Sequence, residues 1–244
     1  MSRHRERNTH SSAPTAQSLR TEKRHKRSPG RPKIPLERII EAAIEIIEAE
    51  GIDALSMRAV ADRLNSGTAT LYRHFSGRTE LIGHVVDKIL SEVSPDWADG
   101  APGDWQSIVA SSARSMYEVL TRHKGFAALI AESIPEGPNA MDRRERLVGL
   151  LLANGFSAEV ASRAFATIAR FVLGFAIQVG EQGSPATETS RPSSLYRHGV
   201  DSRKYPALHA VAGHLPIGLD DEFEFGLQLI LSGLSRLLIR RDED

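Results

Sequence analysis

The chain has no cysteine among its 244 residues and no long, uninterrupted apolar segment. Without cysteine, neither a disulfide framework nor a thiolate-ligated metal site can form. A membrane-spanning helix needs a run of about 18 or more apolar residues, so no membrane partner is expected. The N-terminal segment is charged, and no apolar stretch follows it as it would in a secretory signal. These absences favour a cytoplasmic protein.

Sequence patterns that are typical of several enzyme classes are also missing. The chain has no Gly-rich phosphate loop, no Gly-x-Ser-x-Gly and no His-Glu-x-x-His. His209 and His214 are five residues apart, which is a poor fit to one helix face and hence to a metal pair. We therefore predict no catalytic residue, no metal and no cofactor. The apolar share of 41% is still enough for a sizeable folded core.

The net charge is zero, but the charges are unevenly distributed. Residues 1–34 hold ten Lys or Arg and two Glu, whereas residues 35–94 hold six Lys or Arg and ten acidic residues. A basic segment rich in Ser, Thr and Pro is expected to be disordered when free. It could follow DNA phosphates or enter a minor groove, or it could be only a solubilising tail. Because residues 35–94 are net acidic, we favour a contribution to DNA binding, in which Arg31 and Lys33 take part.

Residues 55–75 contain the most informative pattern of the sequence. Ser56 is a good N-cap, and the apolar residues after it recur at helical spacing. Asn65 and Gly67 tolerate the positive φ angles that a sharp turn needs, and a second helix buries Ala69, Leu71 and Phe75 or their neighbours. Its remaining residues are polar and include no acid. The pattern predicts a helix-turn-helix over about 56–75 that suits a DNA major groove. A surface helical hairpin in an all-α protein is the alternative.

The segments on either side of this hairpin are strongly helical. Residues 35–50 carry an isoleucine-rich apolar stripe, with Pro35 suited to the first helical position and Gly51 to the C′ position. Ser76 can cap a further helix over about 78–93. The hairpin therefore lies second and third in a small helical bundle.

At this point the chain resembles the TetR family of transcriptional regulators. The matching blocks, with fitting spacing, are Arg38–Ala43, Gly51–Arg58, Thr70–Phe75 and Arg78–Ile82. Phe223–Leu234 is similar to the last helix of the branch that includes the tetracycline repressors. Members of that branch use a histidine in the helix that corresponds to about 126–133, where this chain has none, which argues against a metal–tetracycline ligand.

The resemblance implies an all-α fold with two domains, a three-helix helix-turn-helix DNA-binding domain over 35–94 and a helical bundle for effector binding and dimerisation over 95–244. The disordered basic arm over 1–34, which the composition predicts, precedes them. It also implies the function: a repressor that binds a palindromic double-stranded DNA operator as a homodimer and is released by a small, largely apolar effector. An enzyme and a purely structural or protein-binding helical module are the alternatives.

Three sets of residues follow from the residue types and from the resemblance. The DNA-binding set comprises Arg31, Lys33, Ser56, Arg58, Thr68, Thr70, Tyr72, His74 and Arg78, the last as a phosphate clamp. The expected walls of the effector pocket are Trp105, Met116, Phe126, Leu129, Ile130, Met141, Phe171 and Phe175. Helices over about 157–182 and 220–240 are apolar on more than one face, so they could pair with a second copy or lie deep in one monomer. The dimer-interface set on these helices is Phe165, Ile168, Val172, Val179, Leu227, Ile230, Leu234 and Leu237.

Deleting residues 1–33 should weaken operator binding and flatten its dependence on salt. Every phosphate that the shortened chain leaves unneutralised should reduce the slope of log K against log salt by about 0.9, because fewer counterions are released. Fluorescence anisotropy with labelled operator DNA at several salt concentrations measures the slope. An unchanged slope would show that the basic arm neutralises no phosphates.

Overall fold

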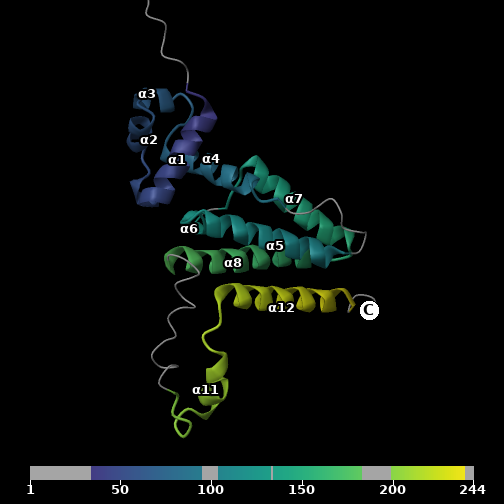
Figure 1. Ribbon diagram of the computed structural model, residues 1–244. Coiled ribbons are helices and arrows are strands. Elements are labelled where there is room, and N and C mark those ends of the chain that lie inside the picture. Colours follow the sequence, from purple (N-terminus) through teal and green to yellow (C-terminus); the bar gives the residue numbers. More distant parts are fainter. Residues whose placement is uncertain (1–33, 95–103, 133, 183–198, 240–244) are drawn as a thin grey trace, which may run out of the picture. The chain divides into compact units, whose positions relative to one another are not determined.

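The computed structural model describes residues 34–94, 104–132, 134–182 and 199–239, and within them it contains helices and no strand. The first four α-helices are α1 (Leu36–Glu50), α2 (Met57–Arg63), α3 (Thr68–Leu71) and α4 (Arg78–Ser91), with a 3-10 turn η1 (Ile52–Ala54) after α1 (Figure 1). The rest comprises α5 (Trp105–Arg122), α6 (Phe126–Glu132), α7 (Pro138–Ala153), α8 (Ala158–Gln182), α11 (Pro206–Val211), η2 (Ala212–His214) and α12 (Leu219–Ile239). The predicted all-α fold class is confirmed.

Helix α1 begins one residue later than the sequence predicts. Pro35 occupies the N-cap position and not the first helical position, with extended backbone angles. Gly51 ends the helix with φ 85°, and its N–H donates to the Ile47 carbonyl. The isoleucine stripe of α1 packs against η1, α2 and α4. The helix therefore forms the core of the N-terminal bundle.

The hairpin of α2 and α3 has the predicted cap and turn, with two differences. The Ser56 hydroxyl accepts from the Ala59 N–H at 3.0 Å. Asn65 alone takes the left-handed conformation, with φ 48°, whereas Gly67 has φ −87°. Leu71 and Phe75 are buried as predicted, but Ala69 is exposed. Helix α3 is only four residues long, so Ala69 lies on its outer side while Leu71 and Phe75 hold it to the bundle.

The sequence suggested that the Ser76 side chain caps α4, but it does not. Gly77 is the N-cap residue, and the Ser76 backbone N–H donates to the Glu80 carboxylate at 2.5 Å. That backbone hydrogen bond lowers the pKa of Glu80. A carboxylate in the first turn thus satisfies the N–H group ahead of the helix and matches the helix dipole.

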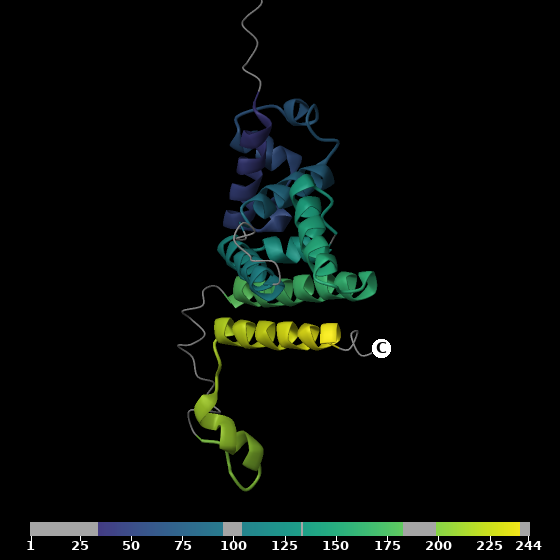
Figure 2. The same cartoon turned by 90° about the vertical axis from the view of Figure 1, so that its right-hand side faces the viewer.

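Helices α5, α8 and α12 run side by side in the C-terminal part of the chain (Figures 1 and 2). The ring of Tyr117 on α5 stacks on Phe223 of α12 with centroids 4.2 Å apart, and its hydroxyl donates to Asp220 at 2.8 Å. Arg114 makes two hydrogen bonds to the Glu224 carboxylate, at 2.6 and 2.8 Å. These contacts fix the register of α12 along α5.

Helix α4 is joined to α7 by one buried carboxylate. Asp87 accepts from the backbone N–H groups of Asn139 and Ala140, at 3.0 and 3.2 Å, and from the Asn139 side-chain amide at 2.8 Å. These groups belong to the first turn of α7, so a residue of α4 caps a helix that lies far along the chain. Gly137 is required beside it, because a Cβ at this position would overlap the Asp87 carboxyl group.

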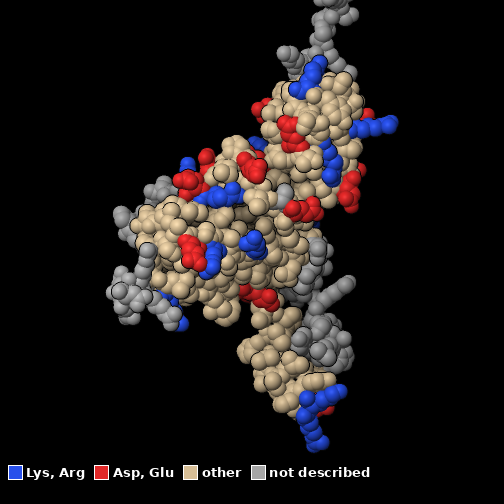
Figure 3. Space-filling model, turned by 180° about the vertical axis from the view of Figure 1, so that it is seen from behind, with Lys and Arg blue, Asp and Glu red and all other residues tan. Residues whose placement is uncertain are grey.

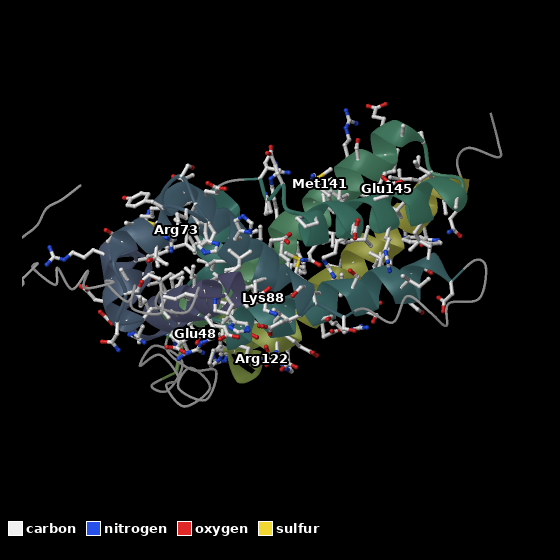
Figure 4. All side chains as sticks on the ribbon, turned by 90° about the horizontal axis from the view of Figure 1, so that it is seen from above. Glu48, Arg73, Lys88, Arg122, Met141 and Glu145 are labelled. Carbon is white, nitrogen blue, oxygen red and sulfur yellow. The ribbon has the colours of Figure 1, made fainter. Side chains whose placement is uncertain are left out.

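A second junction lies at the start of the α5–α6 turn. The two ring nitrogens of His123 are 2.6 Å from Glu48 on α1 and 2.9 Å from Glu92 after α4. Arg122 also approaches Glu92, at 3.4 Å, and Figure 4 labels Glu48 and Arg122 on this side of the molecule. The N-terminal bundle is therefore connected to the C-terminal helices through α4 on two sides.

Replacing Asp87 by Ala should lower the free energy of unfolding by about 1–3 kcal/mol. The change removes three hydrogen bonds and leaves the first N–H groups of α7 without their acceptor. Urea unfolding followed by circular dichroism measures the difference. The matched control is Asp142→Ala, which removes an exposed carboxylate of α7 and should change stability by less than about 0.5 kcal/mol. Equal effects of the two variants would contradict the capping role.

Candidate DNA-binding surface and ligand cavity

The outer side of α3 and the residues after it form an exposed polar surface. Thr68, Tyr72 and His74 are exposed, with 56% of Tyr72 accessible, and Thr70 is half-buried. Arg73 lies on the same surface (Figure 4). Leu71 is fully buried beneath them and anchors the surface to the bundle. Hydroxyl, imidazole and phenol groups of this kind can reach phosphates and base edges.

The other two hairpin residues of the DNA-binding set lie at the start of α2. The Ser56 hydroxyl is already the cap acceptor of this helix. The Arg58 side chain is 88% exposed and lies 3.8 Å from Asp62, whose side chain is also exposed. Such a surface ion pair contributes little to stability, so Arg58 can exchange it for a phosphate at low cost. Arg31 and Lys33 lie outside the described residues.

Arg78 has a structural role that the sequence did not predict. Its Nε group donates to the Leu55 carbonyl at 2.8 Å, and its Nη2 group donates to the Ile52 carbonyl at 2.9 Å. These bonds connect the first turn of α4 to the segment that leads into α2. Arg78 therefore positions the hairpin, and only its remaining N–H groups are left for the expected phosphate clamp.

The charges around this surface have both signs. On the face shown in Figure 3, Lys and Arg side chains alternate with Asp and Glu, and no large patch of one sign appears. This agrees with the net acidic composition of residues 35–94. The folded helices therefore provide little long-range attraction to DNA by themselves.

A cavity of about 770 Å³ lies among the C-terminal helices. Leu90 of α4, Ala140 of α7 and residues of α5, α6 and α8 form its walls, which are mostly apolar. A volume of this size suits a drug-sized small molecule. One wall of the cavity thus belongs to the helix that closes the N-terminal bundle.

Two of the eight predicted pocket residues, Met116 and Ile130, line this cavity. The other six do not, and the reasons differ. Phe171 and Phe175 pack against Phe223 of α12, with ring centroids 5.3 and 5.8 Å apart. Met141 is 47% exposed and lies one turn before Glu145 on α7 (Figure 4). The remaining three, Trp105, Phe126 and Leu129, are buried in the core away from the cavity.

The fold is shared with proteins of known type. A profile described as bacterial regulatory proteins, tetR family, matches residues 39–85, and one described as tetracyclin repressor-like, C-terminal domain, matches residues 98–238. The repressor DrrR1 of Streptomyces coeruleorubidus is 32% identical over 230 residues, which cover 91% of this chain and 84% of DrrR1. The chain belongs to the TetR family. It is a DNA-binding transcriptional regulator.

Solved structures of other TetR-family proteins agree with the fold of this regulator. Apo ActR of Streptomyces coelicolor is 30% identical with a TM-score of 0.76, and the match covers 86% of this chain and 99% of ActR. ActR in complex with actinorhodin is 32% identical with a TM-score of 0.74, covering 83% and 97%. BioQ with its double-stranded DNA operator is 25% identical with a TM-score of 0.59, covering 83% and 99%.

The predicted dimer residues of this TetR-family regulator mostly face the interior of the monomer. Phe165, Ile168 and Val172 of α8 line the cavity, whereas Val179, Leu227 and Leu234 are buried in the core. Ile230 is half-buried, and Leu237 alone in the set is well exposed, at 46%. The other face of α12 carries Phe225 and Leu229, which are 68% and 58% exposed. Most of the predicted residues of α12 therefore lie on its inner face, opposite the exposed Phe225 and Leu229, and their part in a dimer interface stays a prediction.

Helix α8 is strongly apolar over most of its length. Among the described residues, it alone is long and apolar enough to cross a membrane by composition, and only 28% of that window is buried. Core helices of soluble proteins can have the same composition. In a DNA-binding regulator, such exposed apolar surface is better explained by contact with another protein surface.

Sequence reasoning missed the polar residues of the cavity. Arg143 and Ser112 both line it, and they are 3.1 Å apart through a hydrogen bond. A signal was present, because Arg143 follows the spacing of Ala140, Leu147 and Leu151 on the inner face of α7. A charged residue on an apolar stripe marks a polar group inside a site.

The histidines at 209 and 214 do not share a helix. His209 lies on α11 and its Nδ1 is 3.0 Å from the Val200 carbonyl, whereas His214 lies in η2. In the described parts of the chain, no three or more His, Asp or Glu side chains form a group that could hold a metal ion.

Separate substitutions of Tyr72 and Arg78 should distinguish a residue that contacts DNA from a residue that positions the hairpin. Tyr72→Ala should weaken operator binding by about 1–3 kcal/mol, roughly 5- to 150-fold in Kd, with little change in stability because the side chain is exposed. Arg78→Met should lower the free energy of unfolding by about 1–3 kcal/mol as well, because two backbone carbonyls lose a charged donor. Anisotropy and urea unfolding measure the two quantities. Unchanged stability in Arg78→Met would contradict the positioning role.

Proposed function

We propose that this regulator is a repressor that binds a two-fold symmetric DNA operator as a homodimer and leaves it when a small, largely apolar effector binds. The observation that carries the proposal is the position of α4. Its N-terminal residue Arg78 is bonded to the segment before α2, and Leu90 near its C-terminal end lines the cavity. One helix therefore links the cavity to the DNA-binding hairpin.

The relatives support three parts of this proposal, namely repression, operator binding and ligand binding. DrrR1 is a repressor, BioQ has been solved with its operator and ActR with actinorhodin. For this chain, we propose that Tyr72, His74, Thr68 and Thr70 contact the operator, with Arg58 near its phosphates. The proposed domain boundaries are 1–34 for a basic arm, 35–94 for DNA binding and 95–244 for effector binding and dimerisation. We further propose that the protein has no enzymatic activity and acts in the cytoplasm.

For the dimer, we propose the outer face of α12 together with α8. Phe225, Leu229 and Leu237 lie on one exposed side of α12 and would remain in water in a monomer. Burying them against a second copy would gain about 25 cal/mol for each Å² of apolar surface removed from water. Two copies related by a two-fold axis would present two α3 hairpins to two operator half-sites.

The test is binding of the purified full chain to the DNA upstream of its own gene. We expect a specific gel-shift complex at moderate salt and a dimer by light scattering. The double variant Phe225→Glu and Leu229→Glu should be monomeric and should bind operator at least tenfold more weakly, because two charges per copy would be buried at the interface.

The matched control is Leu152→Glu, which replaces an exposed leucine at the end of α7. It should remain dimeric and keep operator affinity. A wild-type chain that is monomeric and binds no upstream DNA specifically would overturn the proposed function.

A further inference from the structure

The guanidinium of Arg143 is a partly buried cationic group at the cavity wall. Its Nη1 group donates to the Val93 carbonyl at 3.2 Å, and its Nη2 group donates to the Ser112 hydroxyl at 3.1 Å. Both acceptors are neutral. Among the described residues, no carboxylate forms an ion pair with Arg143. Burial lowers the pKa of Arg143 to about 10, which reflects the cost of keeping an uncompensated charge there.

The other charged groups at the cavity wall are also mainly cationic. Arg144 lies over the Phe165 ring at 5.7 Å and donates to the Pro135 carbonyl at 3.3 Å, and Arg170 lines the cavity from α8. Glu132, at the end of α6, is the single acidic residue of the wall in the described chain. The remaining walls are mostly apolar. This combination is complementary to an apolar molecule that carries a negative charge.

The partner of Arg143 connects this charge to the DNA-binding bundle. Val93 follows the end of α4, so the Nη1 bond attaches the C-terminal end of α4 to α7. A carboxylate is a stronger acceptor for a guanidinium than a backbone carbonyl is. An anion bound at Arg143 would therefore compete with the Val93 carbonyl for the guanidinium N–H groups.

We propose that the effector of this regulator is an apolar molecule with a carboxylate group, which Arg143 binds with help from Ser112. The carboxylate takes over the hydrogen bond that Arg143 makes to Val93, and α4 loses one of its attachments to α7. This inference rests on the proposed function, because it specifies the ligand class and the release step of the same cavity.

The test compares acids with uncharged molecules of the same shape, using the full-length protein. The probes are 1-naphthylacetate with 1-naphthylacetamide, and 9-anthracenecarboxylate with 9-anthracenecarboxamide, titrated by isothermal calorimetry up to 1 mM. For at least one pair, the acid should bind at least tenfold more tightly than its amide. Arg143→Met should reduce this preference to within twofold, and Arg143→Lys should retain part of it.

The matched control is Arg146→Met, which replaces an exposed arginine on α7 outside the cavity. It should keep the full preference for acids and wild-type operator affinity. Ligand-free Arg143→Met should bind operator more weakly than the wild type, because the Val93 bond is gone. Melting followed by circular dichroism establishes that the variants are folded.

Three results would overturn the proposal: equal binding of acids and amides, an acid preference that survives in Arg143→Met, or no binding of either acid at 1 mM. None of these results bears on whether the wild-type chain binds its upstream DNA in the gel shift. Failure of that DNA complex to form would instead contradict the proposed function.

Discussion

The buried carboxylate of Asp87 is the interaction on which the arrangement of this protein depends. The Asp87 side chain of α4 accepts hydrogen bonds there from two backbone N–H groups and one side-chain amide of α7. A buried carboxylate is tolerated only when donors of this kind surround it. The capped turn of α7 leads directly into the cavity wall, to which Ala140 of that turn and Arg143 of the next turn both belong. The position of the cavity relative to α4 thus follows from a single capping contact.

The apolar helix α8 uses different faces for the cavity and for its contact with α12. One of its faces contributes Phe165, Ile168 and Val172 to the cavity, and another packs Phe171 and Phe175 on α12. This division explains why α8 is more apolar than a surface helix. It also places the cavity next to the helix pair that forms the proposed dimer interface.

Local patterns predicted the fold well, because caps and turns depend on residues close in sequence. Ser56 was recognisable as an N-cap, and its hydroxyl accepts a hydrogen bond from the first turn of its helix. The cavity could not be predicted in the same way. Helical spacing shows that Phe171 and Ile168 are both buried, but it does not show which neighbouring helix each one meets. The internal bonds of Arg78 were equally invisible, because they join residues more than twenty positions apart.

The exposed face of α12 also has a consequence for gene dosage. A symmetric operator needs two chains, so while monomers predominate its occupancy rises with the square of the amount of protein. In the proposed dimer, Phe225 and Leu229 would set the protein concentration at which dimers begin to predominate, because their burial would determine how tightly two copies associate. The apolar side chains of one helix face would thereby set the copy number at which the regulated genes are turned off.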